Sequence, residues 1–180
     1  MDIDLKYNVI YADPPWSFKT YSDKGKDRSP EKHYSVMSFK DICNMPVNNI
    51  ARDNSVLLMW AIDPLLDKAF EVIKAWGFTY KTVAFTWAKT NKTKPGFFTG
   101  LGYWTRGNPE MCLLATKGKP KRINKSVKQL VVDKRREHSR KPDIIYQHIE
   151  NLLEGPYIEL FARQKRKGWD SWGNEVNKWN

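Results

Sequence analysis

The residues best suited to chemistry stand together near the start of the chain, in the sequence Asp13-Pro14-Pro15-Trp16. Each proline fixes its own φ and lacks an N–H, so the carbonyl groups of Asp13 and Pro14 belong to a stiff turn and can act as preset acceptors. Asp13 adds a charged acceptor, and Trp16 adds a large flat ring. This set suits an electron-poor ring with an exocyclic amino group, because the amine can donate two hydrogen bonds while the ring stacks. Adenine and cytosine both meet this description.

An amine held in this way is prepared to act as a nucleophile. Hydrogen bonds to a carboxylate and a carbonyl draw its lone pair out of conjugation and stabilise the positive charge that grows as the nitrogen attacks an electrophile. A simpler interpretation is a turn in which Asp13 caps backbone N–H groups and Trp16 fills the core. The aromatic residue and the apolar strand before the motif favour the chemical interpretation.

Strands and helices must position this motif. The apolar run at residues 9–12 predicts a buried strand that ends at the prolines. Asp13 then lies at the carboxyl end of a strand, which is where ligands bind in open α/β sheets. Further strands are expected at residues 56–61, 78–89, 110–117, 129–133 and 156–162, the last of these being the final strand. Helices are expected from Ser38, over residues 65–76 and after Pro142. Trp76 and His148 fall on the apolar stripes of helices and are expected in the core.

The composition favours a globular protein with a polyanionic partner. The 180 residues, 41% of them hydrophobic, predict a single domain over residues 1–180, and the formal net charge is +11. Cations cluster between residues 117 and 141. We expect residues 117–128 to form a loop that faces phosphates, with Lys119, Lys121 and Arg122 as contacts. The alternative is a generally basic surface.

Two other segments are expected to be loops near the motif. Residues 17–40 show no sustained periodicity and are interpreted as a lid beside the target base. Residues 92–108 combine glycines with aromatic residues and cations, a set that can stack bases and hold phosphates. A hydrophobic loop pinned to the core is the alternative for this second segment.

Several classes of protein are disfavoured. No apolar run approaches the roughly 20 residues needed to cross a bilayer, and the first residues do not form a signal peptide, so we expect a cytoplasmic protein without a membrane partner. Cys43 and Cys112 lack a second thiol or a histidine at ligand spacing, which predicts neither a disulfide nor a metal site.

The motif Asp13-Pro14-Pro15-Trp16 after a strand resembles the catalytic motif of amino-directed methyltransferases, specifically of the MT-A70 family, which includes the catalytic subunit of the eukaryotic mRNA adenine methyltransferase. Other blocks are similar to those of the family and come in its order, at residues 34–38, 87–91, 99–100, 118–120, 138–143, 158–163 and 172–174. The resemblance implies a Rossmann-like, S-adenosylmethionine-dependent methyltransferase fold, α/β, with a mixed, mostly parallel sheet and helices on both faces.

The resemblance also implies substrate-side roles. Asp13 and the carbonyl of Pro14 would hold the target amine, on the turn that Pro15 stiffens. Trp16, and Tyr34 as a second wall, would stack the target base. The block that contains Trp87 and Lys89 is assigned to the substrate side as well.

For the cofactor, Lys141 would pair with the methionyl carboxylate of S-adenosylmethionine. Asp13 would lie near its sulfonium end. Arg163 and Asn174 would hold the ribose hydroxyls. Glu175 stands where the eukaryotic member has an amide. The chain departs from the usual glycine-rich turn, because Ala162-Arg163-Gln164 follows the cofactor strand where G-x-G is expected. Little sequence precedes Asp13, so the contact to the adenine of the cofactor is expected to come from another segment or to be missing.

The predicted function is transfer of a methyl group from S-adenosylmethionine to the 6-amino group of adenine in DNA, on a flipped or unpaired base. DNA is favoured over RNA because the chain is short and shows neither a zinc-finger module nor a long partner-binding insertion; we expect a monomer or homodimer. The alternatives are the same reaction on RNA, an inactive methyltransferase-like nucleic-acid-binding subunit, and cytosine or a protein glutamine as the acceptor.

Overall fold

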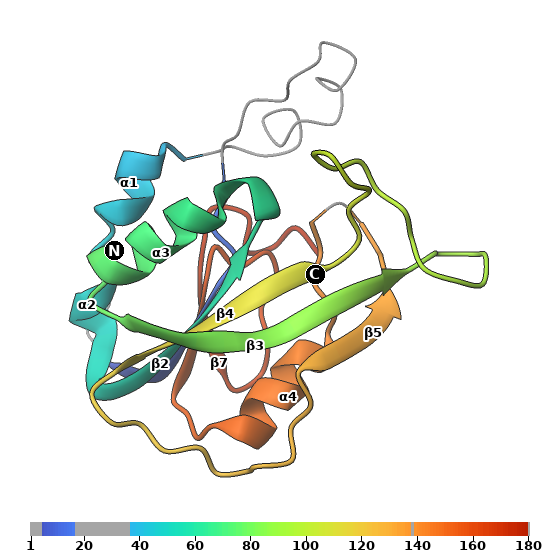
Figure 1. The fold of residues 1–180 in the computed structure, drawn as a ribbon. Helices are drawn as coiled ribbons and strands as arrows, with labels where there is room; N and C mark the ends of the chain where they lie inside the picture. Colours follow the sequence, from blue (N-terminus) through green and yellow to red (C-terminus); the bar gives the residue numbers. More distant parts are fainter. Residues whose placement is uncertain (1–4, 17–36, 138, 180) are drawn as a thin grey trace.

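The structure is a computed structural model that describes residues 5–16, 37–137 and 139–179 (Figure 1). Residues 17–36 of the predicted lid (residues 17–40), with Tyr34, lie outside the described residues, as does His138. Seven strands form one sheet in the order β5-β3-β4-β2-β1-β6-β7. Their bounds are β1 (Tyr7–Ala12), β2 (Ala51–Ala61), β3 (Thr79–Thr90), β4 (Glu110–Lys117), β5 (Leu130–Lys134), β6 (Tyr157–Leu160) and β7 (Trp169–Trp172).

The sheet is mostly parallel. β1 pairs in parallel with β2 and with β6, β6 with β7, and β3 with β5. Among the described strands β4 alone runs against its neighbours, and it is antiparallel to both β2 and β3. The amino end of β4 therefore lies at the same edge of the sheet as the carboxyl ends of the other strands.

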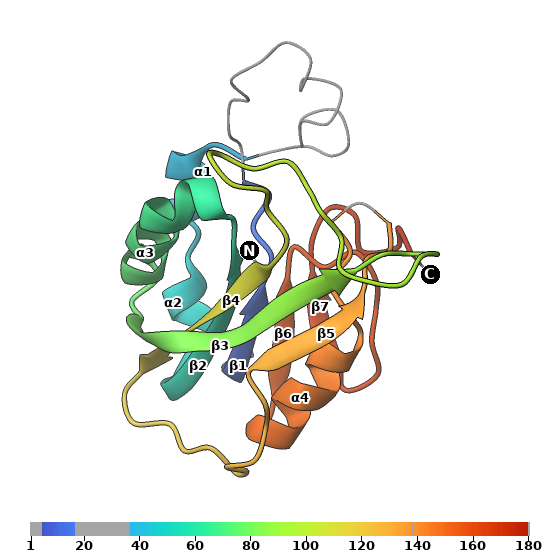
Figure 2. The ribbon, with the colours of Figure 1, turned by 45° about the vertical axis from the view of Figure 1, so that its right-hand side comes forward.

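Helices cover both faces of the sheet, as predicted (Figure 2). Alternate residues of β1 face opposite sides: Ile10 packs in the cluster that contains Val72 of α3 (Leu66–Ala75), whereas Tyr11 packs in the cluster that contains Ile149 of α4 (Ile144–Leu152). The shorter helices α1 (Phe39–Cys43) and α2 (Val47–Ile50) join α3 on its face, and η3 (Asp63–Leu65) leads into α3. Because β1 is buried on both faces, its position is fixed by packing from two sides.

Local signals account for the helix ends. The Ser38 hydroxyl accepts a hydrogen bond of 3.1 Å from the N–H of Asp41 and caps α1, as predicted. After α3 the chain turns at Gly77, where φ is +82° and a Cβ would lie 2.9 Å from the Asn48 side chain. The predicted core position of Trp76 is confirmed, since it is fully buried and donates a 2.8 Å hydrogen bond to the carbonyl of Ile42.

Two elements were not predicted. Residues 156–162 were expected to contain the final strand, yet β7 follows β6 at the edge of the sheet, and α2 precedes β2. Both are four residues long, and neither Trp-Asp-Ser-Trp nor Val-Asn-Asn-Ile is long enough to show a period. Within the described part of the chain no helix is long and apolar enough to cross a membrane.

Candidate active site at the carboxyl edge of the sheet

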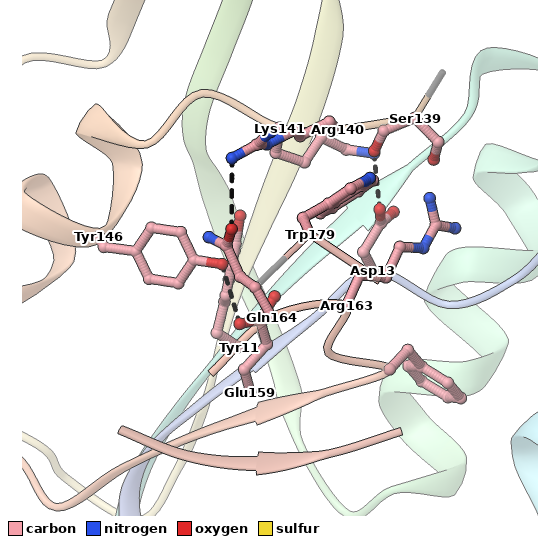
Figure 3. A pocket seen from close by; sticks show the side chains of 11 residues that line it. Tyr11, Asp13, Ser139, Arg140, Lys141, Tyr146, Glu159, Arg163, Gln164 and Trp179 are labelled. Atoms are coloured by element: carbon pink, nitrogen blue, oxygen red, sulfur yellow. Dashed lines mark hydrogen bonds and ion pairs between the residues drawn. The ribbon is translucent and has the colours of Figure 1, made fainter. Parts of the chain in front are cut away.

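A pocket opens where the carboxyl ends of β1 and β6 lie side by side, with Ala12 paired to Leu160 (Figure 3). Four parts of the chain enclose it: the end of β1 with the turn after it, the start of α4 with the segment before it, β6 with the turn that follows, and the segment near the C-terminus that carries Trp179. The lining residues are Tyr11, Asp13, Ser139, Arg140, Lys141, Tyr146, Glu159, Phe161, Arg163, Gln164 and Trp179. Asp13, predicted to be catalytic, and two cations predicted to bind the cofactor, Lys141 and Arg163, thus share one cavity.

A chain of ion pairs passes through the site. The Nζ of Lys141 lies 2.7 Å from a carboxylate oxygen of Asp13 and 3.3 Å from one of Glu110, whose other oxygen lies 2.6 Å from the Nζ of Lys89. Burial opposes the charge of Glu110, yet Lys141 and Lys89 lower its pKa to about 2. Burial likewise opposes the charge of Lys141, and Asp13 and Glu110 more than offset this and raise its pKa. The Lys141 ammonium and the Glu110 carboxylate are therefore charged at neutral pH.

The direction of β4 explains why Glu110 is in this chain of ion pairs. Glu110 is the first residue of an antiparallel strand, so it lies at the edge where β1 ends. Nothing in the local sequence distinguishes Glu110 from a solvated acid at a strand end, and sequence reasoning missed it. Its position depends on the pairing of β4 with β2 and β3.

The turn after β6 replaces the expected glycine-rich sequence by other means. Phe161 adopts the left-handed region with φ of 62°, a conformation that glycine normally provides. The N–H of Ala162 donates a 3.0 Å hydrogen bond to the carbonyl of Trp172, and a Cβ on Gly173 would lie 2.7 Å from the Ala162 backbone. Gly173 is therefore required for close approach of the segment after β7. This contact holds the turn that places Arg163 in the pocket.

The predicted ribose-binding residues are only partly brought together. Arg163 is buried in the pocket lining, and its Nε lies 3.3 Å from the Glu175 carboxylate. The guanidinium also lies over the Trp179 ring, 5.4 Å from its centroid. Glu175 does not line the pocket itself but pairs with Arg163, which does. Asn174 is exposed and does not line the pocket.

Glu159 was missed by sequence reasoning. It stands in β6 between Ile158 and Leu160, faces the pocket and accepts a 2.8 Å hydrogen bond from the Tyr146 hydroxyl. Burial raises the pKa of Glu159 to about 7, although the Tyr146 hydrogen bond opposes the rise. A single acid within an apolar strand was the available signal, because a carboxyl is rarely buried without a partner or a function.

The raised pKa of Glu159 predicts that stability falls as pH rises. The folded protein keeps the Glu159 proton up to about pH 7, whereas the unfolded chain loses it near 4.5, so folding becomes less favourable between these values. The shift corresponds to roughly 3 kcal/mol. Glu159→Gln is expected to remove this dependence and to be the more stable protein at pH 8, measured by urea unfolding from pH 4 to 8. Glu154→Gln, at an exposed position, is the control; an unchanged pH profile in Glu159→Gln would contradict the assignment.

Two aromatic residues expected on the substrate side are buried. Trp16 is 4% exposed, and its indole N–H donates a 3.1 Å hydrogen bond to the carbonyl of Trp60. Trp87 is 3% exposed and donates to the carbonyl of Asp133. Both rings fill the core. The structure therefore corrects the expected stacking role of Trp16 and favours its simpler interpretation as a core residue. The prolines keep their predicted place, and the Pro14 carbonyl accepts a 2.8 Å hydrogen bond from the Trp16 N–H, which leaves it one further lone pair.

The predicted phosphate contacts Lys119, Lys121 and Arg122 lie far from Asp13, and this prediction is corrected as well. The loop that carries them follows β4, whose last residue, Lys117, pairs with Ser55 near the amino end of the parallel strands. The N–H of Lys119 bonds the side chain of Asn54 at that same end. Figure 1 shows this loop at the end of the sheet opposite the end of β1. Because β4 is antiparallel to its neighbours, the loop that follows it lies at the edge opposite Asp13. The direction of β4 could not be predicted from the sequence.

Lys89 remains at the site but in a different role from the expected one. Its Nζ pairs with Glu110 and lies 5.3 Å from the centroid of the Trp87 ring. Lys89 does not line the pocket and instead pairs with Glu110, which in turn pairs with Lys141.

Taken together, the mostly parallel sheet, the helices on both of its faces and the acidic turn at the end of β1 define a Rossmann-like methyltransferase. Comparison with protein families identifies the particular one: the MT-A70 family model matches residues 7–175, and the chain belongs to this family of N6-adenosine methyltransferases.

Individual relatives differ in how much of their length the chain matches. It is 33% identical over 189 residues to the Type II methyltransferase M.MunI of Mycoplasma sp, a match that covers 95% of this chain and 78% of that protein. It is 30% identical over 186 residues to the N(6)-adenosine-methyltransferase catalytic subunit METTL3 of Homo sapiens, covering 98% of this chain and 30% of METTL3. The MT-A70-like protein of Medicago truncatula is 32% identical, with 28% of its length covered. The chain thus spans most of the first relative and less than a third of the other two.

Proposed function

We propose that this protein transfers a methyl group from S-adenosylmethionine to the 6-amino group of adenine in DNA. The observation that carries the proposal is the pairing of Asp13, on the proline turn after β1, with Lys141 at a pocket that also holds Arg163. The Asp13 carboxylate suits the target amine, and the Lys141 ammonium suits the carboxylate of the cofactor. The Arg163 guanidinium follows the neighbouring strand, β6, and adds a further donor.

The chemistry of the pocket fits S-adenosylmethionine. Its methionyl part carries a carboxylate and an ammonium group, and the pocket offers the Lys141 ammonium for the first and the carboxyl of Asp13 or Glu159 for the second. Arg163 and Glu175 provide a donor and an acceptor for ribose hydroxyls. When bound, the cofactor supplies an electrophilic methyl group.

The residues of the chain then have separate roles. The Asp13 carboxylate and the Pro14 carbonyl accept hydrogen bonds from the target amine and stabilise the charge that develops on its nitrogen. No general base is required before transfer, because the neutral amine already has a lone pair; the surplus proton leaves afterwards. Lys141 connects the cofactor side of the site with the side that holds the target amine, because the cofactor carboxylate competes with Asp13 for the Lys141 ammonium. Release of Asp13 from Lys141 makes its oxygens stronger acceptors for the amine.

DNA is preferred over RNA as the polymer because of the similarity to the Type II methyltransferase M.MunI, which is 33% identical over 95% of this chain. RNA is the second candidate, because the similarity to the METTL3 proteins runs over almost the whole of this chain. A paired adenine must leave the helix for its amine to reach Asp13, so a flipped or unpaired base is part of the proposal.

The test is transfer of labelled methyl from S-adenosylmethionine to double-stranded DNA, single-stranded DNA and RNA of mixed sequence at matched salt. The nucleosides are then separated and identified by mass. We expect label in 6-methyladenine, with DNA preferred over RNA. Label in RNA alone would establish the second candidate, and label in cytosine would overturn the assignment of the base. Absence of label from every polymer, with S-adenosylmethionine bound, would overturn the proposal.

A further inference from the structure

The segment between β3 and β4, residues 91–109, lies at the same edge of the sheet as the candidate active site. β3 ends at this edge because β3, like β2, is antiparallel to β4 and so runs in the direction of β1. β4 begins at the same edge with Glu110, which pairs with Lys141. Figures 1 and 2 show the segment rising from the ends of these two strands, beyond the sheet. A polymer that delivers a base to Asp13 passes close to this segment.

Backbone and amide hydrogen bonds hold the segment in shape. The Asn108 side chain accepts a 2.9 Å hydrogen bond from the N–H of Lys89 and donates to the carbonyls of Lys89 and Phe98. The N–H of Gly100 donates a 2.8 Å hydrogen bond to the carbonyl of Gly107. A Cβ on Gly102 would lie 2.4 Å from the carbonyl oxygen of Thr105, so only glycine fits there. These hydrogen bonds and the close approach at Gly102 give residues 91–109 a defined conformation, anchored to β3 through Lys89.

The segment at residues 91–109 exposes aromatic side chains to solvent. Trp104 is fully exposed, and Phe97 is 63% exposed. Trp104 has φ of 65°, a left-handed conformation that is unfavourable for a bulky side chain. Phe98 is half-buried, and the Arg135 guanidinium lies over its ring, 3.9 Å from the centroid. The alternative of a hydrophobic loop pinned to the core does not describe Trp104, whose ring is fully exposed.

Charge points to the kind of partner that covers this surface. Residues 91–109 contain Lys92, Lys94 and Arg106 and no acidic residue. A second copy of the chain, which itself carries a formal net charge of +11, is a poor match for this surface. A strand of nucleic acid is a good match, because its phosphates can pair with the cations and its bases can stack on an indole ring.

We propose that residues 91–109 form a docking site for the nucleic-acid strand that flanks the target base. Trp104 stacks on a nucleobase of that strand, and Arg106 with Lys92 and Lys94 neutralises its phosphates. This inference rests on the proposed function for the nature of the polymer and adds to it a second contact region, distinct from the pocket of Asp13.

Binding of a mixed-sequence single-stranded oligonucleotide tests the stacking contact. Trp104→Ala is expected to weaken binding by about 5- to 100-fold, the range that loss of one stacked base gives. Trp104→Phe keeps a stacking face and is expected to recover most of the affinity. The matched control is Ile123→Ala, which removes an exposed apolar side chain at the opposite edge of the sheet. Affinity for S-adenosylmethionine, measured by calorimetry, is expected to be unchanged in all three variants.

The salt dependence of the same binding tests the phosphate contacts. Arg106→Gln is expected to reduce the slope of log affinity against log salt by about 0.7, the value for one phosphate contact on a single strand. Arg122→Gln, on the loop after β4 at the far edge, is expected to leave the slope unchanged. An unchanged slope in Arg106→Gln, or an equal reduction in Arg122→Gln, would count against the site.

The outcomes separate this inference from the proposed function. Undiminished oligonucleotide binding by Trp104→Ala overturns the docking site, whether or not methyl is transferred. A change of sedimentation in Trp104→Ala, from a larger to a smaller species, also overturns it and assigns the surface to a second copy. Binding that depends on Trp104 together with no transfer to any polymer supports the docking site and overturns the proposed enzyme.

Discussion

Replacement of Asp13 by alanine is expected to reduce methyl transfer by about 100- to 1000-fold or more, the range observed when a preset group that stabilises transition-state charge is removed. Asp13 is the carboxylate nearest the proline turn, and its oxygen pairs with Lys141 at 2.7 Å. Loss of the carboxylate leaves Lys141 paired with Glu110, so the ammonium keeps a partner and the fold is maintained. The measurement is the single-turnover rate with saturating S-adenosylmethionine and nucleic acid.

Cofactor affinity distinguishes a chemical role of Asp13 from a structural one. We expect Asp13→Ala to bind S-adenosylmethionine nearly as tightly as the parent protein, since Lys141 becomes more available to the cofactor carboxylate. Asp67→Asn, an exposed acid on α3, serves as the control and should retain full activity. An active Asp13→Ala protein would remove the proposed mechanism, and loss of cofactor binding in step with loss of rate would assign Asp13 to binding.

Replacement of Lys141 by methionine is expected to have the second large effect, on both stability and cofactor affinity. The Lys141 side chain is only 10% exposed and neutralises two carboxylates, so its loss leaves Asp13 and part of Glu110 without compensation. Breaking such a buried pair costs about 3–5 kcal/mol. Loss of a charged hydrogen bond to the cofactor carboxylate adds a drop in affinity of about 10- to 100-fold. Urea unfolding and calorimetry at a temperature where the variant is folded measure the two effects.

Lys89→Met is the matched control for the Lys141 experiment. Lys89 pairs with the same Glu110 from the other side, so its loss should also reduce stability, but it does not line the pocket. We therefore expect Lys89→Met to bind S-adenosylmethionine with nearly parental affinity. Combining Lys141→Met with Glu110→Gln should restore part of the stability without restoring affinity. Equal cofactor affinity in the Lys141 and Lys89 variants would remove Lys141 from the cofactor site.

The chain of ion pairs gives the site its resting arrangement. The four residues come from different parts of the chain: Asp13 from the turn after β1, Lys141 from the segment before α4, Glu110 from β4 and Lys89 from β3. Each charge is held by at least one neighbour, so the site stays organised before substrates bind. This organisation reduces the rearrangement needed when a carboxylate ligand reaches Lys141.

The sequence alone determined the main elements of the fold and the central motif. The apolar runs and the helical stripes predicted the positions of β1 to β6 and of the principal helices, because burial on one or two faces imposes a period that can be read directly. The exception in length is β2, which was expected from residue 56 and begins at Ala51. The same reasoning put Asp13 at the end of β1, and the resemblance to the MT-A70 family put Lys141 and Arg163 at a shared site, where the structure brings all three together.

Which other residues join these three depends on the tertiary structure. The antiparallel direction of β4 brings Glu110 to Lys141 and carries Lys119, Lys121 and Arg122 to the far edge, and strand direction depends on long-range pairing that no local pattern encodes. Burial decided the rest: it turned Trp16 and Trp87 into core residues and left Trp104 in solvent, although all three are tryptophans close to the site in sequence or in space. A side chain's type states what it can do, and its neighbours in the folded chain decide whether a ligand can reach it.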